Sequence, residues 1–146
     1  MIGLLKFGMR METFRIQHRV TYAKTDQMGV VYHGNYAEFY EIGRAEMLRS
    51  VGYPYSELEK KGIQMPILDM HCKFIGSALY DELITIEAIV YERLKGVRIK
   101  VDYKIYNEQD KLINEGYTTL CCIDAETKRP VRIPNEMWES LGFFEE

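Results

Sequence analysis

The chain has 146 residues, 47% of them hydrophobic and 28% charged, with a formal net charge of -3. These values are typical of one globular domain and exclude a disordered or fibrous chain. The acidic balance also argues against a domain that binds nucleic acid, because such domains usually carry a basic excess. We therefore expect a single domain over residues 1–146.

The first residues are mildly apolar (MIGLLKFGMR), but Lys6 interrupts them and the run is too short for a signal peptide or a membrane span. We expect a flexible tail over residues 1–11, no membrane insertion and a cytoplasmic location. The three cysteines, Cys72, Cys121 and Cys122, are odd in number and lack metal-ligand spacing. They predict buried thiols rather than a disulfide framework or a metal site, and nothing in the sequence indicates a cofactor.

A strand is predicted from Phe14 to Val20, because apolar and polar residues alternate there. Residues 24–34 contain two glycines and no clear period, which predicts a loop. The other predicted elements are strands over 67–75, 83–94, 97–106 and 112–123 and short helices over 54–61 and 135–142.

A long helix is predicted after the loop. Asn35 is a good N-cap and Glu38 follows three residues later, which is typical of a capping box. Gly52 provides the C-terminal stop. Gly43, within the helix, costs about 1 kcal/mol relative to alanine and therefore indicates close approach to a packed surface. The apolar face comprises Tyr36, Phe39, Tyr40, Ile42, Gly43, Met47 and Leu48.

This order of elements predicts an α+β fold, with a five-stranded antiparallel sheet and one long helix against it. One helix covers five strands poorly, and the edge strands need a partner. We therefore expect a homo-oligomer in which two sheets join.

Residues 22–36 (YAKTDQMGVVYHGNY) carry a longer signature, which continues in Phe39, Glu41, Arg44, Glu46, Leu48 and Arg49. The signature resembles the hot-dog-fold acyl-CoA thioesterases, and most closely the 4-hydroxybenzoyl-CoA thioesterase-like family that includes the Tol-Pal-associated branch. The resemblance spans roughly residues 14–135. It implies a sheet wrapped around the helix, dimers with a continuous sheet, a homodimer or homotetramer, and an acyl-CoA substrate. Two departures are Lys24, where an acid is common, and residues 76–78, where a Pro-Ala pair is common.

Asp26 is the only acid in the loop between the first strand and the helix. A thioester carbonyl needs a nucleophile or a base that delivers water, and an ionised carboxylate can serve as either. The backbone N–H groups of His33, Gly34 and Asn35 lie just before the helix, where a developing oxyanion fits. His33 follows Asp26 by seven positions, which is enough for the loop to fold back.

The resemblance implies that Asp26 is the catalytic carboxylate and that the His33 backbone N–H polarises the carbonyl. It also implies that the side chains of Tyr22 and His33 line the site. Gly34, Asn35 and Tyr36 are the corresponding substrate-binding candidates.

Each of these residues also has a structural interpretation. Asp26 can be a turn residue, Tyr22 a core residue at the strand end, and Asn35 a cap. Glu41 is a weak alternative to Asp26 as the carboxylate, and Glu41 and Glu46 can instead pair with Arg44 or Arg49. Candidate contacts for the CoA phosphates are Arg93, Lys95, Arg98, Lys128 and Arg129, although such charges are usually only solvated.

The sequence therefore predicts an acyl-CoA thioesterase that acts on small acyl or aromatic-acyl groups. One alternative is a hydratase or dehydratase of acyl thioesters on the same fold, although the His-Phe-Pro segment of that class is missing. The other is an acyl-CoA-binding protein without catalytic activity.

Overall fold

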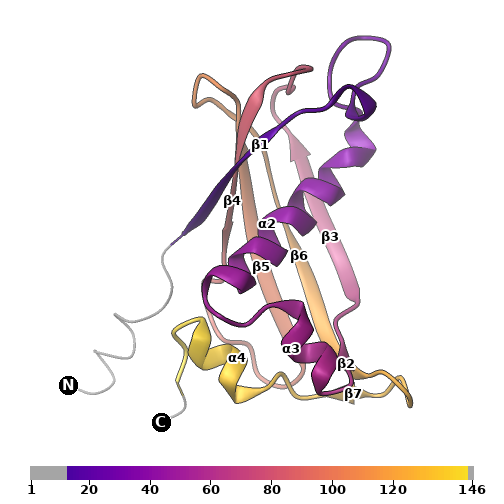
Figure 1. The fold of residues 1–146 in the computed structure, drawn as a ribbon, viewed down its shortest axis with the longest axis vertical. Helices are drawn as coiled ribbons and strands as arrows, with labels where there is room; N and C mark the ends of the chain where they lie inside the picture. Colours follow the sequence, from indigo (N-terminus) through magenta and orange to yellow (C-terminus); the bar gives the residue numbers. More distant parts are fainter. Residues whose placement is uncertain (1–12, 145–146) are drawn as a thin grey trace, which may run out of the picture.

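A computed structural model describes residues 13–144, so the tail expected over residues 1–11 lies outside the described residues. An antiparallel sheet curves behind one long helix in this structure (Figure 1). The helical elements are η1 (Tyr22–Lys24), η2 (His33–Asn35), α2 (Tyr36–Ser50), α3 (Tyr55–Lys60) and α4 (Asn135–Ser140). The strands are β1 (Phe14–Arg19), β2 (Ile63–Gln64), β3 (Ile67–Phe74), β4 (Leu83–Ile89), β5 (Arg98–Tyr106), β6 (Leu112–Asp124) and β7 (Pro130–Val131).

The main sheet has the strand order β1-β4-β5-β6-β3, and all its pairs are antiparallel. The predicted five-stranded sheet is thereby confirmed. The strands β2 and β7, two residues each, add to the far end of β6 and are too short for a periodicity to reveal. Pairing aligns residues across the sheet in rows. One row is Ile16, Ile86, Ile105, Asn114 and Phe74, and the next row on the same face of the sheet is Phe14, Ala88, Tyr103, Gly116 and Cys72.

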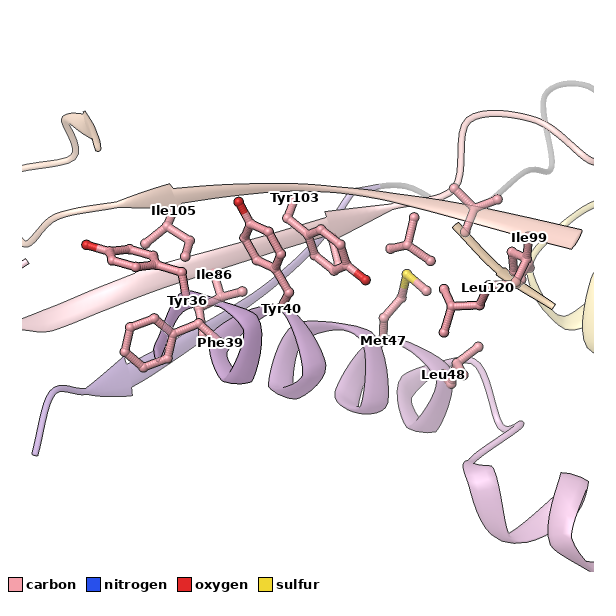
Figure 2. Packing of buried hydrophobic residues seen from close by; sticks show 14 of the residues in the cluster. Tyr36, Phe39, Tyr40, Met47, Leu48, Ile86, Ile99, Tyr103, Ile105 and Leu120 are labelled. Atoms are coloured by element: carbon pink, nitrogen blue, oxygen red, sulfur yellow. The ribbon is translucent and has the colours of Figure 1, made fainter. Parts of the chain in front are cut away.

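The predicted apolar face of α2 packs on these rows, as Figure 2 shows. The Tyr40 ring stacks on Tyr103, with centroids 4.3 Å apart. A Cβ atom at Gly43 would lie 2.8 Å from Cγ2 of Ile86, so glycine allows the close approach that the sequence indicated. Gly52, with φ +84°, ends the helix as predicted.

Arg44 is buried, which the sequence did not predict. Its Nε donates a hydrogen bond to the Tyr55 hydroxyl at 2.6 Å, and its Nη1 donates to the Tyr103 hydroxyl at 3.0 Å. The expected pairing of Arg44 with a helix-surface acid is therefore wrong. The other expected ion pair is present, between Glu46 and Arg49 at 3.4 Å.

β3 is an edge strand that α2 covers only in part, through Tyr36 and Tyr40. The helix lies over β1, β4 and β5, while β3 pairs with β6 alone among the described residues. Met70 is 46% exposed and Phe74 52%, and Ile67 and Leu68 are exposed as well. These apolar side chains and the strand's open edge form the part of the molecule that is least complete in a single chain.

Candidate active site

Asp26 lies in a tight turn of the loop that links β1 to the helix. Its backbone N–H donates to the Val30 carbonyl at 2.9 Å, and its carbonyl accepts from the Gly29 N–H at 3.0 Å. One carboxylate oxygen, Oδ1, accepts the Met28 N–H at 2.8 Å. Gly29 has φ +78°, a conformation that glycine adopts without strain. The turn role expected for Asp26 is thus present, but it occupies only one carboxylate oxygen.

The loop folds back as a small hairpin to the start of the helix. Thr25 and Val31 form an isolated antiparallel bridge, and the Tyr32 N–H donates to the Lys24 carbonyl at 2.9 Å. Asp26 therefore lies towards the hairpin tip, and His33 directly follows the returning segment. Within the described range no contact is recorded between the two side chains, so the return of the Asp26 carboxylate over the helix start stays a prediction.

The expected capping box is wrong. The Asn35 side chain makes no capping hydrogen bond, and its Nδ2 donates instead to the Lys24 carbonyl at 2.9 Å. Glu38 forms an ion pair with the Lys24 side chain. Both residues fasten the loop to the helix rather than cap it. Lys24, one of the two departures from the family pattern, is consequently neutralised by Glu38.

The helix starts with unused backbone donors. The η2 turn precedes α2, and the Asn35 N–H already donates to the Tyr32 carbonyl at 2.9 Å. Within residues 13–144, no acceptor is recorded for the N–H groups of His33 and Gly34. A Cβ at Gly34 would lie 2.7 Å from the Tyr32 ring, so glycine lets this ring lie against the helix start. Two free donors at the positive end of a helix can stabilise an anionic oxygen.

Aromatic rings from three segments surround this helix start. The Phe74 ring, from β3, contacts Tyr36 at 5.4 Å and His33 at 6.3 Å between centroids. Tyr32 packs on His33 at 4.3 Å. Tyr36 is buried, and burial raises the pKa of its hydroxyl, so it remains neutral at ordinary pH. The sequence analysis missed Phe74, because only the register of β3 on β6 shows that it adjoins His33.

Tyr22 does not belong to the core. It is 77% exposed, so the interpretation as a core residue is wrong, and its ring contacts Tyr80 at 5.7 Å. No contact with Asp26 or His33 is recorded. Tyr22 can reach a ligand at this site only on the solvent side.

Basic residues gather at the other end of the molecule. A hollow of about 560 Å³ is lined by Arg93, Lys95 and Arg132, with Ile133, Pro134 and Phe144 among its apolar walls. Arg93 also donates to Asn135 at 2.8 Å and lies over the Trp138 ring. The expected candidate Arg98 is outside this hollow, as are Lys128 and Arg129. Arg132, three positions after Arg129, was missed because the sequence does not show which of these cations faces the hollow.

Neither a metal site nor a membrane-spanning helix is found in the described range. Residues 13–144 contain no group of three or more histidines, cysteines or acids placed to hold a metal ion. No helix in this range is both long and apolar enough to cross a membrane.

Comparison with known proteins gives consistent results. The profile of the thioesterase-like superfamily matches residues 20–141. Escherichia coli (O6:H1) YbgC, an acyl-CoA thioester hydrolase, is 29% identical over 129 residues, which are 88% of this chain and 96% of YbgC. YneP of Bacillus subtilis is 34% identical over 113 residues, 77% of this chain and 81% of YneP. The structure of a DHNA-CoA thioesterase from Staphylococcus aureus superposes with a TM-score of 0.83 at 33% identity, covering 90% of this chain and 89% of that one.

Proposed function

This chain belongs to the thioesterase-like superfamily and is a thioester hydrolase with the hot-dog fold, and we propose that it hydrolyses small acyl or aromatic-acyl CoA thioesters at the loop of Asp26 and His33. The products are the free acid and CoA. The observation that carries the assignment of the site is a carboxylate with an unoccupied oxygen in the same loop-and-helix unit as two free backbone N–H groups.

In this proposal the Asp26 carboxylate acts in one of two ways. It attacks the thioester carbonyl carbon, so that CoA leaves as a thiolate and water then hydrolyses the mixed anhydride. Alternatively, it accepts a proton from a water molecule that attacks the same carbon. The hydrogen bond from the Met28 N–H to Oδ1 supports both routes, because it orients the carboxylate while Oδ2 stays available.

The carbonyl oxygen is polarised by the backbone N–H of His33, with Gly34 as the second donor. Tyr36 and Phe74 form an aromatic wall next to these donors, which suits an acyl group. Asn35 contributes by holding the loop through Lys24. The His33 and Tyr22 side chains line the substrate path, and the exposure of Tyr22 restricts it to the outer rim.

The test is a panel of acyl-CoAs assayed for released thiol, with Asp26→Asn alongside the wild type. We expect Asp26→Asn to lower kcat by about 10²- to 10⁴-fold. Asp81→Asn is the matched control, because Asp81 is an exposed acid of a neighbouring turn whose side chain makes no recorded contact, and it should keep full activity. Full turnover by Asp26→Asn overturns the catalytic assignment.

The same assay separates the alternatives. A hydratase or dehydratase would add or remove one water without releasing thiol. An acyl-CoA-binding protein would bind tightly and release nothing.

We also propose that the hollow of Arg93, Lys95 and Arg132 binds the phosphates of CoA. Three cations around one concave surface support this, because phosphate groups are favoured by clustered arginine and lysine side chains. Lys95→Ala and Arg132→Ala should raise KM for acyl-CoA and leave KM for the matching acyl-pantetheine unchanged. An equal rise for both substrates contradicts the assignment.

The oligomer that we propose joins two chains along β3, as a homodimer or as the dimer unit of a homotetramer. The open edge of β3 and its exposed apolar side chains support this arrangement. An antiparallel two-fold pairing of β3 with its copy brings the α4 end of one chain beside the α2 start of the other, and these ends lie far apart within one chain (Figure 1). The phosphate hollow then serves the Asp26 loop of the neighbouring chain.

The family branch and the location of the protein are two further proposals. We propose the Tol-Pal-associated branch of the family, which the signature over residues 22–36 supports. We also propose a cytoplasmic location, which fits the free thiols of Cys72, Cys121 and Cys122.

A further inference from the structure

A buried polar cluster lies on the helix side of the sheet, and the hydrolytic site described above does not use it. The Tyr40 hydroxyl, which points from α2 towards the sheet in Figure 2, donates to Oδ1 of Asn114 on β6. Asn114 Nδ2 donates to Sγ of Cys72 on β3 at 3.2 Å, and Tyr40 Oη lies 3.5 Å from the same sulfur. Tyr40 and Asn114 are fully buried, whereas Cys72 is partly exposed. The thiol is therefore the one group through which this cluster meets the surface.

The fold holds the cluster closely in place. A Cβ at Gly116 would lie 2.6 Å from the Tyr40 hydroxyl and 2.0 Å from the His71 carbonyl oxygen. Only glycine leaves room there for the hydroxyl between the helix and the paired strands β3 and β6. The Tyr40 ring is also stacked on Tyr103, which restricts its movement. The thiol is therefore held in a fixed position, as a group that recognises a ligand must be.

The cluster also lies at a defined distance from the proposed acyl wall. Cys72 is two positions from Phe74 on the same face of β3, which is about 7 Å along a strand. Tyr40 is one turn beyond Tyr36 on α2, about 6 Å along a helix. Cys72 and Tyr40 therefore lie at similar distances from the Tyr36–Phe74 ring pair, and each distance is close to the length of one aromatic ring.

We propose that Cys72 is a specificity residue of the acyl site, whose thiol, held by Asn114 and Tyr40, hydrogen-bonds a polar substituent at the far end of the acyl group. This inference rests on the proposed function, because it takes the acyl group to lie along Phe74 and Tyr36. A thiol can donate weakly through S–H and accept weakly through sulfur, so either a hydroxyl or a carbonyl substituent fits. The ligand class is a one-ring acyl thioester that carries such a group opposite its thioester carbonyl.

A purely structural role for the cluster predicts different behaviour. If the thiol only completes the hydrogen bonding of Asn114, its removal weakens the fold and slows all substrates alike. If the thiol recognises the substrate, its removal changes the preference between two substrates that differ only in the polar substituent. The ratio of their kcat/KM values separates these cases, because a general loss of folded protein cancels in the ratio.

The experiment compares 4-hydroxybenzoyl-CoA with benzoyl-CoA in the wild type, Cys72→Ser and Cys72→Ala. We expect Cys72→Ala to lower the ratio of kcat/KM values by roughly three- to tenfold, the effect of one neutral hydrogen bond, and Cys72→Ser to retain most of it. Cys121→Ala is the matched control, since Cys121 is a buried thiol on the opposite face of β6, and its ratio should equal that of the wild type. An unchanged ratio in Cys72→Ala overturns the proposal.

A second measurement does not depend on turnover. The thioether 4-hydroxyphenacyl-CoA cannot be hydrolysed, so its binding can be followed by the rate at which a small alkylating reagent modifies Cys72, read by peptide mass spectrometry. We expect this compound to slow the modification and CoA alone to leave it unchanged. A thiol that reacts equally fast with and without the compound, or that never reacts, contradicts the proposal. If Asp26→Asn stays fully active while protection is seen, the catalytic assignment fails and the Cys72 inference stands.

Discussion

Single glycines decide how closely the layers of this protein approach, and Gly116 is the most constrained of them. Its missing side chain leaves space for the His71 carbonyl of β3 and for the Tyr40 hydroxyl of α2. We predict that Gly116→Ala lowers the free energy of unfolding by about 3 kcal/mol, because the added Cβ overlaps a backbone atom that cannot move without distorting the β3–β6 pairing. Urea unfolding followed by the fluorescence of buried Trp138 measures the loss.

Gly76→Ala is the control for this prediction. There the nearest atom is Cγ2 of Ile113 at 3.1 Å, a side-chain methyl group that can shift by the few tenths of an ångström required. Its cost should remain below about 1 kcal/mol. Equal losses in the two variants would show that backbone overlap at Gly116 is not the cause.

Some residue roles could be read from the sequence, and others depend on distant partners. The helical spacing of Tyr36, Tyr40 and Met47 predicted a buried face correctly, because their burial follows from the helix period alone. The partners of Arg44 are Tyr55 and Tyr103, from another helix and a strand, and no pattern within α2 indicates them. Charge spacing therefore suggested a surface ion pair of Arg44 that the structure does not contain, although the suggested pair of Glu46 with Arg49 is present.

The junction between the loop and α2 is the element whose chemistry differs most from expectation. Asparagine and aspartate are nearly equivalent at an N-cap, so the capping interpretation predicts that Asn35→Asp is neutral. In the structure, Asn35 Nδ2 is the donor to the Lys24 carbonyl. Asn35→Asp replaces this donor with an acceptor, and we predict a loss of about 1–3 kcal/mol in unfolding free energy together with a lower kcat.

The matched control for Asn35→Asp is Asn107→Asp. Oδ1 of Asn107 accepts the N–H groups of Gln109 and Lys111, so aspartate retains both hydrogen bonds. Thermal unfolding of the two variants should therefore differ clearly. A neutral Asn35→Asp would restore the capping interpretation.

The turn between β6 and β7 gives the protein a pH-dependent contribution to stability. Hydrogen bonds from the backbone N–H groups of Thr127 and Glu126 lower the pKa of the Asp124 carboxyl below its usual 3.8. A lowered pKa in the folded state stabilises the protein fully above the unfolded value and loses this effect as pH falls through the folded value. The difference in Tm between wild type and Asp124→Asn should therefore be constant from pH 7 to pH 5 and shrink below about pH 3.8.

Asp110→Asn controls for the general effect of removing a carboxylate from a turn. Asp110 lies in the turn between β5 and β6, and no backbone N–H is recorded as a donor to its side chain among the described residues, in contrast to Asp124. The difference in Tm between the wild type and Asp110→Asn should remain small at every pH. A difference in Tm between the wild type and Asp124→Asn that grows towards low pH would contradict the predicted direction of the pH dependence.

At the scale of the whole molecule, the order of the strands and the long helix followed from periodicity, while the site did not. The loop returns to α2 through hydrogen bonds of Lys24, and Phe74 reaches His33 only through the register of β3 on β6. Such pairings join residues far apart in the chain, so local patterns cannot specify them. Comparison with a family identifies the motif, but the neighbours of the motif come from the fold.

Assembly along β3 can be tested at its two edges. Met70→Asp places a charge among the exposed apolar side chains of β3, and we predict that it converts the proposed oligomer to smaller species in analytical ultracentrifugation. Gln17→Asp, on the opposite edge strand β1, should leave the oligomer intact. Dissociation by Gln17→Asp alone would move the interface to β1.

A composite site predicts rescue between two damaged chains. Asp26→Asn lacks the carboxylate, and Arg132→Ala lacks part of the phosphate hollow, so each homodimer is defective at both sites. If Asp26 of one chain works with Arg132 of its neighbour, a mixed dimer contains one site with neither defect. Co-expression of the two variants should then give thiol release at low acyl-CoA concentration well above the mean of the separate variants. Activity equal to that mean would show that the carboxylate and the phosphate hollow of one site belong to the same chain.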